Sequence, residues 1–147
     1  MDHSLRELYQ EVILDHSRHP RHFGLLDNAT HKAEGYNPLC GDKVTIMLVL
    51  DESGRVTDIK FEGKGCAISQ ASASLMTEML AGKTPAEAER LMTGFLHLVK
   101  GEDAGDLPED ARDHMDVMSG LSAFPMRVKC ATLAWHTYKN AVEEGAQ

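Results

Sequence analysis

Apolar residues recur at the three- and four-residue spacing of an amphipathic helix in four stretches of the chain. The first stretch ends near His16, because Pro20 removes a backbone donor and disfavours helical geometry in the residue before it. The second follows Cys66, the third opens on the capping sequence Thr84-Pro85, and the last begins at Pro125. The four apolar stripes comprise Leu5, Leu8, Tyr9, Val12 and Ile13; Ile68, Ala71, Leu75, Met79 and Leu80; Ala88, Leu91, Met92, Phe95 and Leu96; and Val128, Ala131, Trp135, Tyr138 and Val142.

Two strands are predicted between the first and second helices. Residues 44–50 carry apolar side chains on both faces, which is typical of a buried strand, and residues 55–62 alternate well enough for a second. The turn sequence at 51–54 joins them into an antiparallel hairpin. We expect a loop at residues 20–39 and only weak helical character at residues 111–118. This order of elements predicts an α+β fold with helices on one face of a small sheet.

Length and charge narrow the classes of function. A chain of 147 residues with 42% hydrophobic content has the size of one domain, which we place at residues 1–147. The formal charge of −8 repels phosphate backbones, so we expect no nucleic-acid partner. Charged residues interrupt the first 20 positions, so we expect no signal peptide or membrane span, and a cytoplasmic protein.

Candidate chemistry lies at the three cysteines, an odd number without a C-x-x-C pair, which favours free thiolates or metal ligands over a disulfide framework. Cys40 and Asp42 stand one residue apart, so in extended geometry both side chains would point the same way. Cys66 begins a helix, where free N–H groups favour a thiolate, and Cys130 lies in the second turn of the last helix. Arg127, three residues earlier, lies on the same helical face and would offset the negative charge.

Three thiolates and one carboxylate match the ligands that zinc prefers. Spacing alone leaves an alternative open, since cysteines are often buried as small apolar residues and need not meet. A second metal interpretation concerns the H-x-x-H-x-x-H series of His16, His19 and His22. Pro20 breaks the helix that would align these imidazoles, so solvated or capping roles are favoured for them.

Several motifs in a fixed order carry a family resemblance. They are Leu8-Tyr9, Asp15-His16, Pro20-Arg21 with Gly24, Asn37-Pro38-Leu39-Cys40-Gly41-Asp42, Gly63-Lys64-Gly65-Cys66-Ala67-Ile68-Ser69 and Val128-Lys129-Cys130. With these motifs the chain resembles the U-type iron–sulfur scaffold proteins over nearly its whole length. The resemblance implies an α+β fold of the SufE/IscU type, with a small antiparallel three-stranded sheet and helices packed on one face.

Two features resemble the SufU branch of this family more than the IscU branch. Lys129 stands where IscU proteins have a histidine, and 63 residues separate Cys66 from Cys130, a longer gap than in IscU. The resemblance implies a zinc ion held by Cys40, Asp42, Cys66 and Cys130, and a cysteine desulfurase of the SufS type as partner. It also implies a sulfurtransferase-like carrier rather than a stand-alone enzyme.

In this interpretation Cys40 would accept persulfide sulfur, Arg127 would stabilise the thiolate or persulfide, and a downstream iron–sulfur scaffold would receive the sulfur. Two other functions stay open. The same ligands could hold iron or a [2Fe–2S] cluster on a scaffold that passes the cluster on. Alternatively, the zinc could be purely structural in a module that binds a partner.

Overall fold

The computed structural model describes the backbone of residues 3–145 and the side chains of residues 7–145. In chain order the elements are α1 (His3–Arg18), β1 (His31–Asn37), β2 (Asp42–Leu50), β3 (Val56–Lys64), α2 (Ala67–Leu80), α3 (Pro85–Leu98), α4 (Glu109–Asp116), the 3-10 helix η1 (Ser119–Ala123) and α5 (Pro125–Glu144). The four predicted amphipathic helices and the predicted hairpin are confirmed. The weakly patterned stretch forms the short helix α4, followed by η1.

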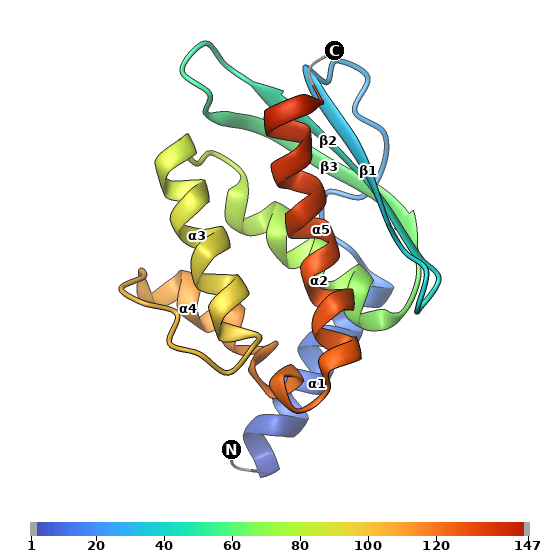
Figure 1. The fold of residues 1–147 in the computed structure, drawn as a ribbon, viewed down its shortest axis with the longest axis vertical. Helices are drawn as coiled ribbons and strands as arrows, with labels where there is room; N and C mark the ends of the chain where they lie inside the picture. The colour runs from blue at the N-terminus through green and yellow to red at the C-terminus, as the bar shows by residue number, and fades with distance from the viewer. Residues whose placement is uncertain (1–2, 146–147) are drawn as a thin grey trace.

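The three strands form one antiparallel sheet in the order β1-β2-β3, which confirms the three-stranded sheet implied by the family resemblance. Helices α5 and α2 pack against this sheet, α1 packs on α2, and α3 and α4 form an outer layer (Figure 1). At the start of α3, Thr84 and Glu87 make the reciprocal hydrogen bonds of a capping box. Among residues 3–145, no helix combines the length and apolar character needed to span a bilayer.

Strand β1 corrects the loop expected at residues 20–39. Its residues alternate between half-buried and exposed, and little in the sequence HKAEGYN is strongly apolar. The strand is held by pairing with β2, where Ala33 lies opposite Ile46, and by packing against α5. A Cβ atom at Gly35 would overlap the Thr137 hydroxyl, so glycine allows α5 to approach the strand closely. Non-local contacts, rather than local pattern, therefore create this strand.

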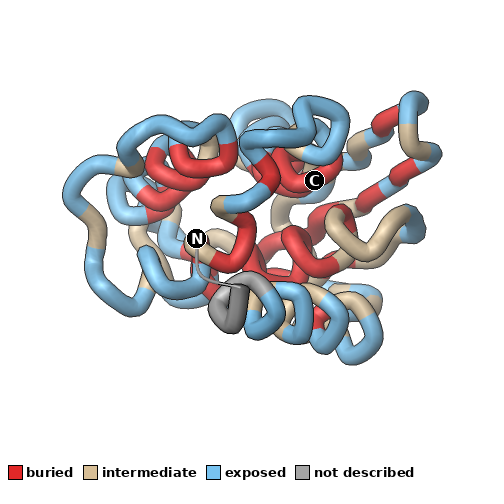
Figure 2. Tube along the Cα trace, turned by 90° about the horizontal axis from the view of Figure 1, so that it is seen from below, coloured by how far each residue is buried: buried red, intermediate tan, exposed pale blue. Residues whose placement is uncertain are grey.

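The core lies between the sheet and the helices. Ile46, Leu48 and Phe61 from the sheet are fully buried, and the tube view shows buried segments of several elements meeting in the interior (Figure 2). On α5, Trp135 is 1% exposed and stacks on Phe95 of α3, with ring centroids 4.8 Å apart. This stack joins α3 to α5, the helix that also carries Cys130.

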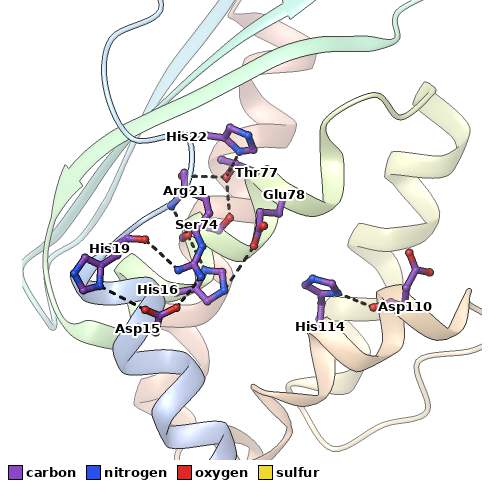
Figure 3. A network of polar contacts seen from close by, with 10 residues as sticks. All are labelled: Asp15, His16, His19, Arg21, His22, Ser74, Thr77, Glu78, Asp110 and His114. Carbon is purple, nitrogen blue, oxygen red and sulfur yellow. Dashed lines mark hydrogen bonds and ion pairs between the residues drawn. The ribbon is translucent and has the colours of Figure 1, made fainter.

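A polar network ties the segment after α1 to α2 (Figure 3). The Ser74 hydroxyl accepts a hydrogen bond from the backbone N–H of Arg21 at 2.8 Å, so its own proton is free to point at Nδ1 of His16, 2.7 Å away. Next to it, His22 Nδ1 lies 3.1 Å from the Thr77 hydroxyl. His22 has a φ of 55°, which is uncommon for a residue other than glycine, and this contact holds the turn in place.

The buried imidazole of His16 makes stability depend on pH. Burial and the nearby Arg21 charge lower the pKa of His16, and His114 acts in the same direction, while Glu78 and Asp15 oppose the shift. The folded state thus binds fewer protons than the unfolded state near the ordinary imidazole pKa. The free energy of unfolding should therefore rise with pH through this range and fall as the solution becomes acidic.

We expect the urea midpoint of the wild type to decrease between about pH 7.5 and about pH 5, and to decrease less in His16→Gln, which accepts a hydrogen bond but does not titrate. The His16→Gln comparison isolates this residue from the other histidines. Equal pH slopes for the two proteins would contradict the assignment.

Candidate metal and sulfur site

The predicted site residues come from four separate segments. Cys40 lies in the turn between β1 and β2, and Asp42 is the first residue of β2. Cys66 is the N-cap of α2, and Cys130 lies in the second turn of α5. All three cysteines are free thiols.

The structure brings three of these residues into one cluster. Ligand atoms of Cys40, Asp42 and Cys130 all lie within 4.8 Å of one another, and this is the one group of its kind among the described residues. The Sγ atoms of Cys40 and Cys130 are 3.2 Å apart. Cys130 and Asp42 are fully buried, whereas Cys40 is half-buried. The cluster thus has a buried floor and one thiol nearer to solvent.

The geometry between Cys40 and Asp42 differs from the expected extended arrangement. Cys40 belongs to a turn, and Gly41 has a φ of 69°, a left-handed conformation that glycine adopts without strain. The turn, rather than strand alternation, brings the Cys40 thiol beside the Asp42 carboxylate. The proximity was predicted correctly, but the reason for it was wrong.

Cys66 contacts this cluster mainly through Asp42, and its side chain also interacts with Cys130. Its backbone N–H donates to Asp42 Oδ1 at 2.9 Å, and its Sγ lies 4.0 Å from Asp42 Oδ2. The sulfur also accepts from the backbone N–H of Ser69 as a helix cap at 3.4 Å. A Cβ atom at Gly65 would overlap the Asp42 carboxylate, so glycine is required for this approach. Cys66 therefore borders the cluster without belonging to it.

The electrostatics of the cluster favour a cation. Burial raises the pKa of the Cys130 thiol, and hydrogen bonds with Cys40, Asp42 and Cys66 raise it further. On the exposed side, two interactions raise the pKa of Arg127. The larger is with the negative charge of a Cys66 thiolate, and the second is a hydrogen bond to Cys130. A guanidinium thus faces the cysteines as expected, and the raised pKa of Cys130 means that its thiolate would need a cation at the site to form.

The donor set fits a zinc ion. Zinc takes four ligands in a tetrahedron with Zn–S distances of about 2.3 Å, so its donor atoms lie roughly 3.8 Å apart. Three ligand atoms within 4.8 Å of one another need only small shifts to reach this arrangement. Cys66 is the natural fourth ligand, since its sulfur is already 4.0 Å from a carboxylate oxygen of Asp42. The assignment of these four residues as ligands stays a prediction.

One neighbour of the cluster was missed by sequence reasoning. Asn37 is 7% exposed, and its side-chain amide lies 3.5 Å from Asp42 Oδ2 and 3.8 Å from Cys130 Sγ as a donor to both. Such a donor orients the ligands from outside the first coordination sphere. Asn37 stands in the motif that ends in Cys40 and Asp42, which is the signal that could have identified it.

The three imidazoles of the histidine series have separate partners. His16 contacts Ser74, His22 contacts Thr77, and His19 lies 3.5 Å from Asp15 on the surface. Each imidazole thus has a different partner, which agrees with the expectation that Pro20 separates them. His16, however, is buried rather than solvated.

Comparison with known proteins identifies relatives along nearly the whole chain. The NifU-like N terminal domain matches residues 8–131. "Zinc-dependent sulfurtransferase SufU" of Bacillus subtilis is 40% identical, covering 97% of this chain and 95% of that protein. "Iron-sulfur cluster assembly scaffold protein IscU" of Thermotoga maritima is 42% identical, covering 93% and 94%. The crystal structure of FiSufU from Fervidobacterium islandicum AW-1 superposes with a TM-score of 0.82 at 36% identity, covering 94% of this chain and 98% of FiSufU. The chain therefore belongs to the NifU-like N-terminal family, the U-type proteins of iron–sulfur cluster assembly.

Proposed function

We propose that this protein is a zinc-dependent sulfur acceptor that takes persulfide sulfur from a SufS-type cysteine desulfurase and delivers it to a downstream iron–sulfur scaffold in the cytoplasm. The observation that carries the proposal is the pairing of one accessible thiol, Cys40, with a fully buried thiol and carboxylate, Cys130 and Asp42. Lys129 and the long gap between Cys66 and Cys130 support the SufU branch. The relative from Bacillus subtilis, named a zinc-dependent sulfurtransferase, supports it too.

Sulfur transfer in this proposal is a thiolate exchange. The Cys40 thiolate attacks the terminal sulfur of the partner's cysteine persulfide, and a new S–S bond forms on Cys40. The bond between the partner's Sγ and its terminal sulfur breaks, and the partner's cysteine leaves as a thiolate. Cys40 then carries a persulfide. The transfer needs no oxidant or reductant, because one S–S bond replaces another. Arg127, whose charge interacts with all three cysteines, would stabilise the negative charge at this point.

Zinc, when bound by Cys40, Asp42, Cys66 and Cys130, would keep the sulfur atoms as thiolates. The protein's own contribution is positional. Asp42 holds the N-terminus of α2 through its bond to the Cys66 N–H, Asn37 donates toward Asp42 and Cys130, and the turn containing Cys40 leaves that thiol accessible.

The proposal is tested by intact mass after incubation with a SufS-type desulfurase and cysteine, with zinc content measured on the same sample. The sulfur acceptor should gain the mass of one sulfur atom while holding zinc. A protein that gains no sulfur but develops the colour of an iron–sulfur cluster when iron is supplied would instead support the scaffold function suggested by the IscU relatives. A purely structural zinc would give neither result, and its removal would unfold the protein.

Variants of Asp42 distinguish metal binding from sulfur acceptance. We expect Asp42→Ala to weaken zinc binding by at least about tenfold, because it removes a buried charge and the acceptor of the Cys66 N–H bond, while Cys40 remains able to carry sulfur. The measurement is competition with a chromogenic zinc chelator. Asp42→Asn is the matched control, since it keeps an oxygen acceptor for Cys66 and loses only the charge. Unchanged zinc affinity in both variants would show that Asp42 is not a ligand.

A further inference from the structure

The three cysteines are not equivalent in their distances from one another. The Sγ atoms of Cys40 and Cys130 are 3.2 Å apart, and a disulfide joins sulfur atoms at about 2.05 Å. A movement of roughly 1 Å would close this gap. Cys130 is held in α5, but Cys40 lies in a short turn beside Gly41, where a small displacement is easiest.

Cys66 is less well placed for such a bond. Its Sγ accepts the N–H of Ser69 as the cap of α2 and lies 4.0 Å from a carboxylate oxygen of Asp42. It also lies outside the group of ligand atoms that are within 4.8 Å of one another. A bond to Cys66 would require the helix cap to break.

We propose that Cys40 and Cys130 are a redox modification site, which closes as an intramolecular disulfide when the metal-free protein meets a peroxide and leaves Cys66 reduced. This proposal goes beyond sulfur acceptance and needs no desulfurase. Its basis is the juxtaposition of one half-buried thiol with one fully buried thiol across 3.2 Å.

Accessibility sets the order of the two steps. Hydrogen peroxide oxidises the half-buried Cys40 to a sulfenic acid and is itself reduced to water. The sulfur of Cys130 then attacks Cys40 Sγ while its thiol proton passes to the departing hydroxyl, the S–O bond breaks, and a second water molecule leaves. Overall, two thiols lose two hydrogen atoms and one peroxide becomes two waters. A dithiol reductant reverses the reaction by thiol–disulfide exchange.

The disulfide would switch the site off without damaging it. Neither sulfur in a disulfide is a thiolate, so the oxidised pair can neither bind a metal nor attack a persulfide. The bond also protects Cys40 from oxidation to sulfinic acid, which is generally irreversible. A resident zinc ion would oppose closure, because its ligands are held as coordinated thiolates.

The test is peptide mapping of protein that has been freed of metal with a chelator, treated with one equivalent of hydrogen peroxide and then alkylated. We expect one disulfide between the peptides that contain Cys40 and Cys130, with the alkyl group on Cys66, and reversal by a dithiol. Zinc-loaded protein should form the disulfide more slowly. A disulfide that contains Cys66, or conversion of Cys40 to sulfinic acid without any disulfide, would overturn the proposal.

Two serine variants sharpen the result. Cys66→Ser should form the same disulfide at a rate comparable to the wild type, whereas Cys130→Ser should form none and should accumulate Cys40 sulfenic acid that a dimedone probe traps. Far-UV circular dichroism checks that each variant is folded. If a variant does not fold, the peptide map of the wild-type protein alone decides which cysteines form the disulfide. A protein that forms the disulfide but accepts no sulfur would contradict the proposed function alone.

Discussion

The Cys40→Ala variant is expected to gain no sulfur from the desulfurase, a complete loss rather than a reduction. Cys40 is the accessible thiol of the cluster, whereas Cys130 is fully buried and Cys66 caps α2. Removing Cys40 removes the nucleophile and its contact with Cys130, but leaves the contacts of Asn37 and Cys66 with Asp42 in place. The measurements are intact mass after incubation with desulfurase and cysteine, and the rate of alanine production by the desulfurase. Stimulation of that rate by this protein should disappear.

The matched control is Cys66→Ala, which also removes one proposed thiolate ligand of zinc but keeps Cys40. This variant should bind zinc more weakly and still gain one sulfur. If both variants lose sulfur acceptance to the same degree, the effect comes from the metal site and not from a nucleophile. A Cys40→Ala protein that gains sulfur as the wild type does would remove Cys40 from the carrier role.

The largest expected effect on stability is that of Trp135→Ala. The indole is 1% exposed and stacks on Phe95, so truncation leaves a large cavity between α5 and α3. Substitutions of this kind lower the free energy of unfolding by about 3–5 kcal/mol. Because small domains are stable by only about 5–15 kcal/mol, much of the folded population should be lost under mild denaturation.

Trp135→Phe is the comparison, since it keeps an aromatic ring on Phe95 and should lower stability much less. The measurement is urea unfolding followed by far-UV circular dichroism, because Trp135 is the only tryptophan and its fluorescence is absent from both variants. A loss below about 1 kcal/mol in Trp135→Ala would mean that the neighbouring helices close the cavity. Zinc content measured on the same samples shows whether the packing of α5 also supports Cys130.

Helix starts that are encoded by residues a few positions apart in the sequence were predicted correctly. The capping box of Thr84 and Glu87 begins α3 as expected, and Pro125 begins α5 in the first helical turn. Cys66 lies at the junction of β3 and α2, where the apolar spacing after it predicted a helix. Each of these features depends on residues a few positions apart, whose hydrogen bonds and backbone preferences act within one turn.

Strand β1 was missed for the opposite reason. Its sequence contains little strongly apolar character, and it becomes a strand because β2 supplies its hydrogen bonds and Gly35 admits α5. The buried state of His16 is of the same kind, because Ser74 and Glu78 belong to a helix more than 50 residues away in the chain. Contacts of this kind leave no periodic trace in the sequence.

The sequence by itself determined the residue types and the local setting of the site: a thiol and a carboxylate before a strand, a thiol at a helix start and a thiol beside basic residues. Only the tertiary structure decided how they group, with Cys40, Asp42 and Cys130 clustered, Cys66 at the border and Asn37 donating to the cluster. The physical reason is that local chemistry is encoded over a few residues, whereas the 3.2 Å between Cys40 and Cys130 depends on how α5 packs on the sheet.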